Sequence, residues 1–170
     1  AYGATGSQYF RFYDLRMALG VTMSGQLSIR WIENKLNEFM NNLLETNNDY
    51  VVASDTDSIY LNLGPLVHKF NLFRGDTLKT IALMDKFCEE KIQPYIDRSY
   101  RELSDYVFAY DQKMQMKREA LADKGIWTAK KHYILQVYNN EGVQYDDPEI
   151  KIMGLEMVKS STPMFIRDNM

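Results

Sequence analysis

The sequence predicts an α+β fold: a small antiparallel sheet with two long helices packed on one of its faces. Apolar residues recur at spacings of three and four over about residues 14–44 and again over about residues 77–110, which is the pattern of amphipathic helices. Residues 50–61 and 113–153 instead carry short apolar runs and alternating patterns between turn residues, which is typical of strands. Helices and antiparallel strands in separate runs along a chain indicate the α+β class.

The helix boundaries follow from capping residues and proline. Asp14 is a good N-cap for the first helix, because its carboxylate can accept hydrogen bonds from the exposed amides of the first turn. The polar run 47–49 ends that helix. Pro94 should kink the second helix or split it in two. A further helix should begin at Thr162 and Pro163.

Two stretches predict tight strand pairs. Residues 50–53 and 59–61 are short apolar runs on either side of the polar residues 54–58, which favours a β-hairpin. Residues 131–138 alternate as a strand does, and residues 139–142 supply turn chemistry.

Composition excludes several classes of protein. A chain of 170 residues that is 45% hydrophobic can hold a packed core, so intrinsic disorder is excluded. No stretch approaches the roughly 20 apolar residues that span a bilayer. The single cysteine, Cys88, excludes an internal disulfide framework and a cysteine-based zinc site, and it fits a reducing cytoplasm. With two histidines, histidine-rich metal chemistry is not expected.

Charge is unevenly distributed along the chain. The formal net charge is −3, yet residues 113–132 carry +4, which leaves −7 for the rest. A basic segment of this kind can bind a phosphate backbone locally, although a solvated basic face explains the pattern equally simply. The six basic residues of this segment are Lys113, Lys117, Arg118, Lys124, Lys130 and Lys131.

The feature best suited to chemistry is the pair Asp55 and Asp57. Two carboxylates one residue apart in an extended segment lie on the same side of the pleat. Their mutual repulsion favours a hard cation, and Mg²⁺ typically binds one or two protein carboxylates together with substrate phosphates. Most Asp-x-Asp pairs are turn residues or solvated acids, so this alternative stays open. An EF-hand and a glycine-rich phosphate loop both lack their required residues here.

Four motifs in order resemble those of family B DNA polymerases. Residues 54–60 resemble motif C of the catalytic palm domain, and residues 2–6 resemble the end of motif B, the finger helix. Residues 130–133 resemble the Lys-x-Tyr element that contacts duplex DNA. Residues 151–156 and 159–163 resemble the palm-to-thumb junction, most closely that of replicative polymerases of T-even-type phages. The resemblance covers nearly the whole chain.

The resemblance implies a reaction and a metal. In the family, a deoxynucleoside triphosphate is joined to a primer 3′-hydroxyl with release of pyrophosphate, assisted by two Mg²⁺ ions. Asp57 would be the main metal ligand, and Asp55 beside it would ligate or orient the site. Lys131 would pair with Asp55 or reach the minor groove at the primer end.

Further residues are implied to bind nucleotide and DNA. Tyr2 and Gly3 would line the minor-groove side of the nascent base pair, and Tyr133 would hold the primer backbone through its hydroxyl. Thr56 is a further DNA-binding candidate. For the tyrosines, packing in the core is the alternative, and Tyr133 alternates with Leu135 on one strand face.

The basic segment fits this picture. Lys124 and Lys130, with Lys113, Lys117 and Arg118, would neutralise duplex phosphates without reading sequence. Glu119 is either a third carboxylate near the catalytic pair or a salt-bridge partner on a strand face. Trp127 is expected to pack in the core rather than to stack on bases.

The chain also departs from the family pattern. Ser54 stands where the family usually has glycine, which is tolerable if the local φ angle is not positive. His132 replaces a frequent arginine, and Lys117 stands where related phage enzymes tend to carry an acid.

We expect a fragment of a longer polymerase. Residues 1–13 would be the end of the fingers, residues 14–160 the palm core and residues 161–170 the start of the thumb. Its partners would be primer–template DNA, deoxynucleoside triphosphates and the remaining polymerase segments (exonuclease, motif A, fingers and thumb), in cis or in trans, in the cytoplasm of the infected bacterial host. A non-catalytic DNA-binding module with a palm-like fold and a cation-binding domain unrelated to nucleic acid are the alternatives.

The first prediction follows from the absence of motif A, which supplies the other metal-binding aspartate in the family. We expect the purified 170-residue chain to show no polymerase activity with Mg²⁺, because half of the metal site is missing. A primer-extension assay measures this, and detectable extension by the chain alone would contradict it.

Overall fold

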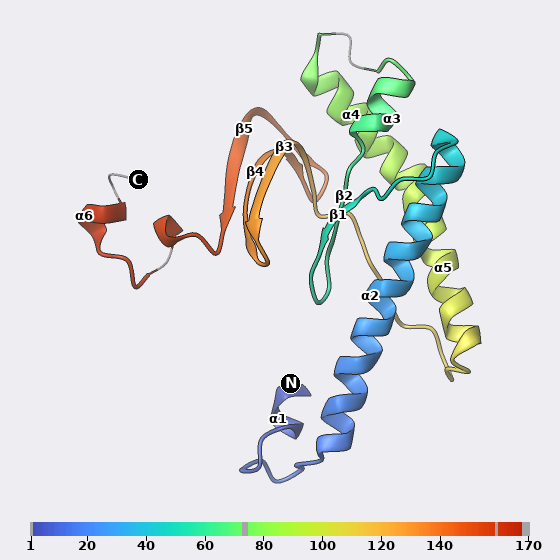
Figure 1. Ribbon diagram of the computed structural model, residues 1–170, viewed down its shortest axis with the longest axis vertical. Coiled ribbons are helices and arrows are strands. Elements are labelled where there is room, and N and C mark those ends of the chain that lie inside the picture. Colours follow the sequence, from blue (N-terminus) through green and yellow to red (C-terminus); the bar gives the residue numbers. More distant parts are fainter. Residues whose placement is uncertain (1, 73–74, 159, 168–170) are drawn as a thin grey trace. The chain divides into compact units, whose positions relative to one another are not determined.

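The structure is a computed structural model that describes residues 2–72, 75–158 and 160–167 (Figure 1). The chain forms two compact units, a first unit of Ala1–Asn62 with Ile96–Gln115 and a second unit of Leu63–Tyr95 with Met116–Met170. The longer elements are α2 (Leu15–Leu44), β1 (Val51–Ser54), β2 (Ile59–Leu61), α4 (Thr77–Phe87), α5 (Gln93–Tyr106), β3 (Ala120–Ala129), β4 (His132–Asn140) and β5 (Val143–Met153). The shorter helices are α1 (Tyr2–Thr5), α3 (Gly64–Lys69), the π-helical η1 (Cys88–Ile92), the 3-10 helix η2 (Glu156–Val158) and α6 (Met164–Arg167).

The fold class is α+β, as the sequence predicts, and the strands divide between two small antiparallel sheets. β1 and β2 form a two-stranded antiparallel sheet in the first unit, and β3, β4 and β5 form a three-stranded antiparallel sheet in the second. The two long helices therefore do not share one sheet. Within the first unit α2 contacts β1, whereas within the second unit α4 contacts β3 and β4.

Helix α2 begins and ends close to the predicted residues. The Asp14 carboxylate accepts a hydrogen bond from the Arg16 amide (2.9 Å), which confirms the N-cap. Hydrogen bonds from the Arg16 side chain and amide hold the pKa of Asp14 below its ordinary value. At the other end Glu45 adopts the left-handed conformation that commonly closes a helix. The buried residues recur every fourth position in the C-terminal part of the helix: Ser28, Ile32, Leu36, Met40 and Leu44.

Polar groups join α2 to α5 inside the first unit. The Trp31 indole donates to the Ser99 carbonyl (2.9 Å), and its ring stacks on Tyr106 with centroids 5.7 Å apart. One turn further along α2, the Lys35 ammonium pairs with the Glu102 carboxylate (2.7 Å). Buried Tyr100 and Leu103 also lie on α5. Of this helix pair, α2 contacts β1 of the hairpin.

Pro94 does not split the second long helix. The π-helical turn η1 directly precedes it, and the Gln93 amide donates to the Cys88 carbonyl, five residues back. Proline lacks the amide hydrogen that the helical ladder needs, and a wider turn of this kind accommodates the lost bond. The helix then ends at Tyr106, four residues before the predicted Tyr110.

The three-stranded sheet follows the sequence pattern closely. β4 buries every second residue, namely Tyr133, Leu135, Val137 and Asn139. It pairs with β3 on one side and β5 on the other, and Glu141 and Gly142 make the predicted turn with φ angles of 50° and 90°.

Smaller differences concern helix starts. The sequence pattern missed α3, in which Pro65 occupies the first turn, the position in a helix that tolerates proline best. Helix α6 begins at Met164, one residue after the predicted first position. None of the helices in the described ranges is long and apolar enough to cross a membrane.

A buried polar network fastens α4 to the three-stranded sheet. The Arg118 guanidinium lies 2.5 Å from a carboxylate oxygen of Asp85, and the two side chains are 16% and 22% exposed. Arg118 also donates to the Asn139 side-chain oxygen (2.9 Å), and the Asn139 amide group donates to Asp85 (3.3 Å). The Gly142 amide completes the network by donating to Asn139 (3.1 Å). This hydrogen-bonded network therefore links α4, the residues just before β3 and the β4–β5 turn.

A second prediction tests this network. Arg118→Met should lower the free energy of unfolding by roughly 3 kcal/mol, because it leaves the Asp85 carboxylate buried without its partner. The neighbouring Lys117 is exposed, so Lys117→Met removes the same charge and should change stability by less than about 0.5 kcal/mol. Urea unfolding of both variants measures the difference, and equal stabilities would show that the network does not hold the unit together.

Candidate functional site

The carboxylate pair lies at the tip of the β1–β2 hairpin. The Asp55 amide donates to the Ser58 carbonyl (2.9 Å), so Thr56 and Asp57 form a tight two-residue turn. Asp55 is half-buried and Asp57 is exposed. The pleat argument made from the sequence does not apply, because Asp57 lies in the turn and not on a strand. The two aspartates are separated by one residue, and the chain reversal places both at one end of the hairpin.

The two carboxylates differ in what they contact. An oxygen of Asp55, Oδ1, accepts hydrogen bonds from the Thr56 amide (2.8 Å) and hydroxyl (3.3 Å). These bonds fix the orientation of Asp55 and stiffen the turn. Asp57 lies exposed at the tip, where a ligand from solvent can reach it.

The pair fits a magnesium ion only as a partial site. Among the described residues there is no group of three or more aspartate, glutamate, histidine or cysteine side chains that could enclose a metal. Mg²⁺ does not need such a group, because it commonly binds one or two carboxylates and completes its shell with water and substrate phosphates. Asp57, with Asp55 beside it, therefore suits a magnesium ion that arrives with phosphate ligands.

The backbone at Ser54 is one in which serine can stand in place of glycine, because its φ angle is not positive. It lies in β1, opposite Ile59, and it is not among the described residues with positive φ. A side chain is therefore tolerated where the polymerase family usually has glycine. The Ser54 hydroxyl lies 3.5 Å from a Glu33 carboxylate oxygen on α2, within reach of a hydrogen bond.

Two asparagines of α2 hold the backbone that leads into the hairpin. The Asn37 oxygen accepts from the Tyr50 amide (2.8 Å), and its amide group donates to the Asp49 carboxylate (2.8 Å). One turn later, Asn41 accepts from the Asn48 amide (2.8 Å) and donates to the Asn48 carbonyl (2.9 Å). Tyr50 is buried. Periodicity did not single out these asparagines, since they resemble any polar residue on an amphipathic helix.

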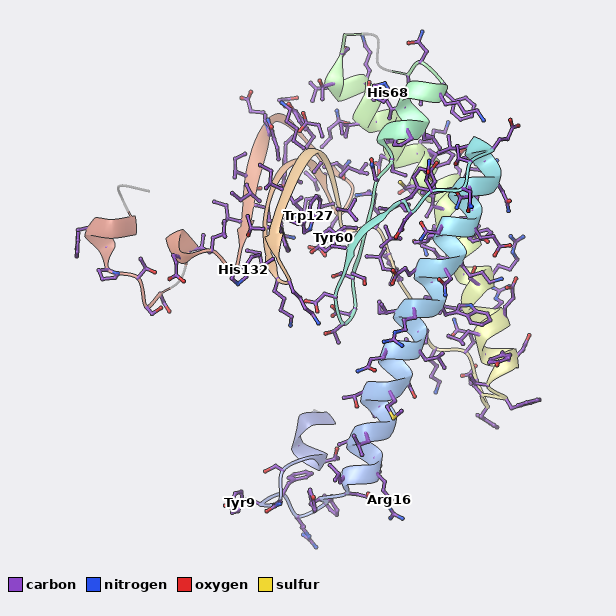
Figure 2. All side chains as sticks on the ribbon, in the orientation of Figure 1. Tyr9, Arg16, Tyr60, His68, Trp127 and His132 are labelled. Atoms are coloured by element: carbon purple, nitrogen blue, oxygen red, sulfur yellow. The ribbon has the colours of Figure 1, made fainter. Side chains whose placement is uncertain are left out.

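The predicted DNA-binding lysines lie in the second unit. Lys124 is on β3, and Lys130 and Lys131 form the β3–β4 turn between the paired residues Ala129 and His132. All three lysines are exposed. Figure 2 labels His132 at the start of β4, which marks the position of this turn.

Tyr133 and Trp127 pack together on one sheet face. They are cross-strand partners with ring centroids 6.5 Å apart, and Tyr133 is 8% exposed. The Trp127 ring lies over Gly125, where an added Cβ would come within 2.6 Å of it. The burial of Tyr133 agrees with the packing alternative, and its contact with the primer stays a prediction.

Two charged residues have roles that the sequence left open or misjudged. The Glu119 carboxylate pairs with the Lys151 ammonium (2.5 Å), which confirms that it is a salt-bridge partner. Its role as a third catalytic carboxylate stays a prediction. Arg118 was expected to neutralise phosphates, which is wrong, because its guanidinium is engaged with Asp85 and Asn139.

The structure shows little about the surroundings of Tyr2 and Gly3, the two nucleotide-binding candidates. Gly3 lies in α1, and an added Cβ there would meet no atom within 4 Å. The side chain of Tyr2 lies outside the described part of the structure. Asp55, Asp57 and Thr56 belong to the first unit, as do these two residues, whereas the lysines, Tyr133 and Glu119 belong to the second.

Comparisons with known proteins find that the chain is similar to part of two DNA-directed DNA polymerases of phages. The polymerase of Escherichia phage RB69 is 43% identical over 177 aligned positions, and that of Enterobacteria phage T4 is 41% identical over the same number. Each alignment covers 98% of this chain but 20% of the relative. The chain therefore spans about a fifth of the length of the polymerases it matches. No family model matches the chain.

A third prediction concerns the asparagine support of the hairpin. Asn37→Ala should lower the free energy of unfolding by roughly 1–2 kcal/mol, because it leaves the Tyr50 amide and the Asp49 carboxylate without their partner. Amide hydrogen exchange across β1 and β2 should become faster. Asn42→Ala, an exposed asparagine of the same helix, is the matched control. Unchanged exchange in Asn37→Ala would show that the hairpin is held by other contacts.

Proposed function

We propose that the chain is the palm segment of a phage DNA-directed DNA polymerase of family B. The similarity to two phage polymerases along 98% of the chain is the observation that carries this proposal. The Asp55–Asp57 turn adds a chemical reason, because it presents carboxylates at a stiff and accessible tip. The reaction would be the addition of deoxynucleotides to a primer 3′ end in phage DNA replication.

Magnesium would be held by Asp57, with Asp55 as a second ligand or an orienting group. When bound, Mg²⁺ supplies charge neutralisation at the reacting phosphate and lowers the pKa of the attacking hydroxyl. The chain's own share is to hold the carboxylates in place. The Thr56 amide and hydroxyl fix Asp55, and the α2 asparagines fix the strand before it.

Primer–template DNA would be held largely through its phosphates. Exposed Lys124 and Lys130 suit sequence-independent neutralisation of the backbone. Lys131 would pair with Asp55 or reach the minor groove at the primer end. Thr56 at the hairpin tip and the Tyr133 hydroxyl would add contacts near the primer end. Positive charge on an exposed turn of an otherwise acidic chain supports this assignment.

The incoming deoxynucleoside triphosphate would contact Tyr2 and Gly3. The remaining parts of the active site would come from the other polymerase segments, in cis or in trans. The two relatives extend well beyond the matched fifth, which supports this division. The reaction would take place in the cytoplasm of the infected bacterial host.

A fourth prediction tests the catalytic assignment in a complete enzyme. The 170-residue chain, exchanged for the matching segment of the phage RB69 polymerase, should support primer extension with Mg²⁺. Asp57→Ala in this chimera should slow extension at least about a thousandfold, because several kcal/mol of charge stabilisation is lost. Its affinity for primer–template DNA should change little.

Asp105→Ala is the matched control, since Asp105 is an exposed acid in the same unit, and it should leave the extension rate unchanged. An Asp57→Ala chimera that extends primers at the parent rate would contradict the catalytic role. Retained DNA binding would then favour a non-catalytic DNA-binding module.

A further inference from the structure

Gly154 lies in close contact with the turn that carries the exposed lysines. An added Cβ at Gly154 would lie 2.2 Å from the Lys131 carbonyl oxygen and 2.6 Å from Cδ2 of the His132 ring. Side-chain carbons do not come that close to a backbone oxygen, so this position has room only for glycine. Its φ angle of 73° is also one that glycine adopts readily and other residues rarely do.

The turn itself has an uncommon backbone. Lys131 has a φ angle of 64°, in the left-handed region that costs an L-residue with a Cβ atom free energy. Such a conformation persists when the surrounding structure holds it in place. The Gly154 backbone packs directly on the Lys131 carbonyl, and the Tyr133–Met153 strand pair brings the two segments together.

We propose that Gly154 is a positioning residue for Lys131. By packing on the Lys131 carbonyl, it holds the turn in the left-handed conformation and thereby sets the direction in which the Lys131 ammonium is presented to DNA. The inference rests on the proposed DNA-binding function of Lys131. The inference gives a role in DNA binding to Gly154, a residue that itself neither contacts DNA nor carries charge.

The chain contains a matched control for this effect. Gly142 also has a positive φ angle, 90°, and lies at the other turn of the same sheet, between β4 and β5. An added Cβ there would meet one atom within 4 Å, a nitrogen of the Arg118 side chain at 4.0 Å. Gly142→Ala therefore introduces the same backbone strain as Gly154→Ala without pushing on a lysine turn.

The experiment measures binding of the 170-residue chain to a fluorescent primer–template duplex at several salt concentrations. Lys131→Met should weaken binding by about threefold to tenfold and reduce the slope of log K against log salt by about 1, as expected when one positive charge no longer contacts the DNA. Gly154→Ala should reproduce both changes, because the ammonium is displaced. Gly142→Ala should keep the parent slope.

A double variant separates positioning from general damage. If Gly154 acts through Lys131, Gly154→Ala should cause no further loss of DNA affinity in the Lys131→Met background. Parent affinity and slope in folded Gly154→Ala, or a loss that adds fully to that of Lys131→Met, would overturn the inference. If Lys131→Met leaves the DNA affinity unchanged, Lys131 has no role in DNA binding. The function assigned to Gly154 is then overturned as well.

A measurement on the unaltered chain keeps the inference testable if Gly154→Ala does not fold. The contact predicts a nuclear Overhauser effect between the Gly154 α protons and the His132 Hδ2 proton. Absence of that signal in the folded chain would overturn the positioning role, whatever the outcome for DNA binding.

Discussion

Both candidate charge clusters depend on one constraint: a two-residue turn points its side chains in a fixed direction only if the strands on both sides are anchored. At the β1–β2 turn the anchor is α2, whose Asn37 and Asn41 bond the backbone just before β1. At the β3–β4 turn the anchor is β5 together with Gly154, which directly follows β5 and lies against the Lys131 carbonyl. At the β1–β2 turn the Asp55 carboxylate adds its own hydrogen bonds with Thr56. Side chains that must stay accessible to a ligand can contribute little buried area, so their order has to come from neighbouring residues.

The charged residues of this chain differ in how far they are exposed to water. Asp85 and Arg118 form a pair that is largely withdrawn from water, and Asn139 forms a hydrogen bond with each of them. A pair of this kind is strongly coupled to stability, because neither charge can be left alone. Asp57, Lys130 and Lys131 are exposed instead. Water screens their charges, so they cost the fold little. From the sequence, Arg118 is grouped with the lysines expected to bind phosphate, because a sequence shows charge but not burial.

Much of the fold could be predicted from the sequence, because it depends on local patterns. The α2 boundaries follow from periodicity and the Asp14 cap, and β4 from strict alternation. Features set by distant contacts could not be predicted. Nothing local indicates that β1–β2 and β3–β5 form separate sheets, or that the helix forms a π-turn before Pro94. For the site, the Asp55–Asp57 turn was visible as a motif, whereas the roles of Asn37 and Gly154 appear only when their partners, 13 and 23 residues away in the sequence, are known.

Ser54 and Gly154 show how the structure distinguishes a glycine that can be replaced from one that cannot. At residue 54 the backbone is an ordinary strand and the side chain reaches towards Glu33, so serine fits where related polymerases usually carry glycine. At residue 154 the backbone is left-handed and a carbonyl oxygen occupies the place of a Cβ. The presence of glycine in a motif does not show whether another residue could replace it. The φ angle and the distance to the nearest backbone atom do show this. The same two criteria place the constraint at 154 on the Lys131 turn, and therefore on the direction of a charge rather than on the core.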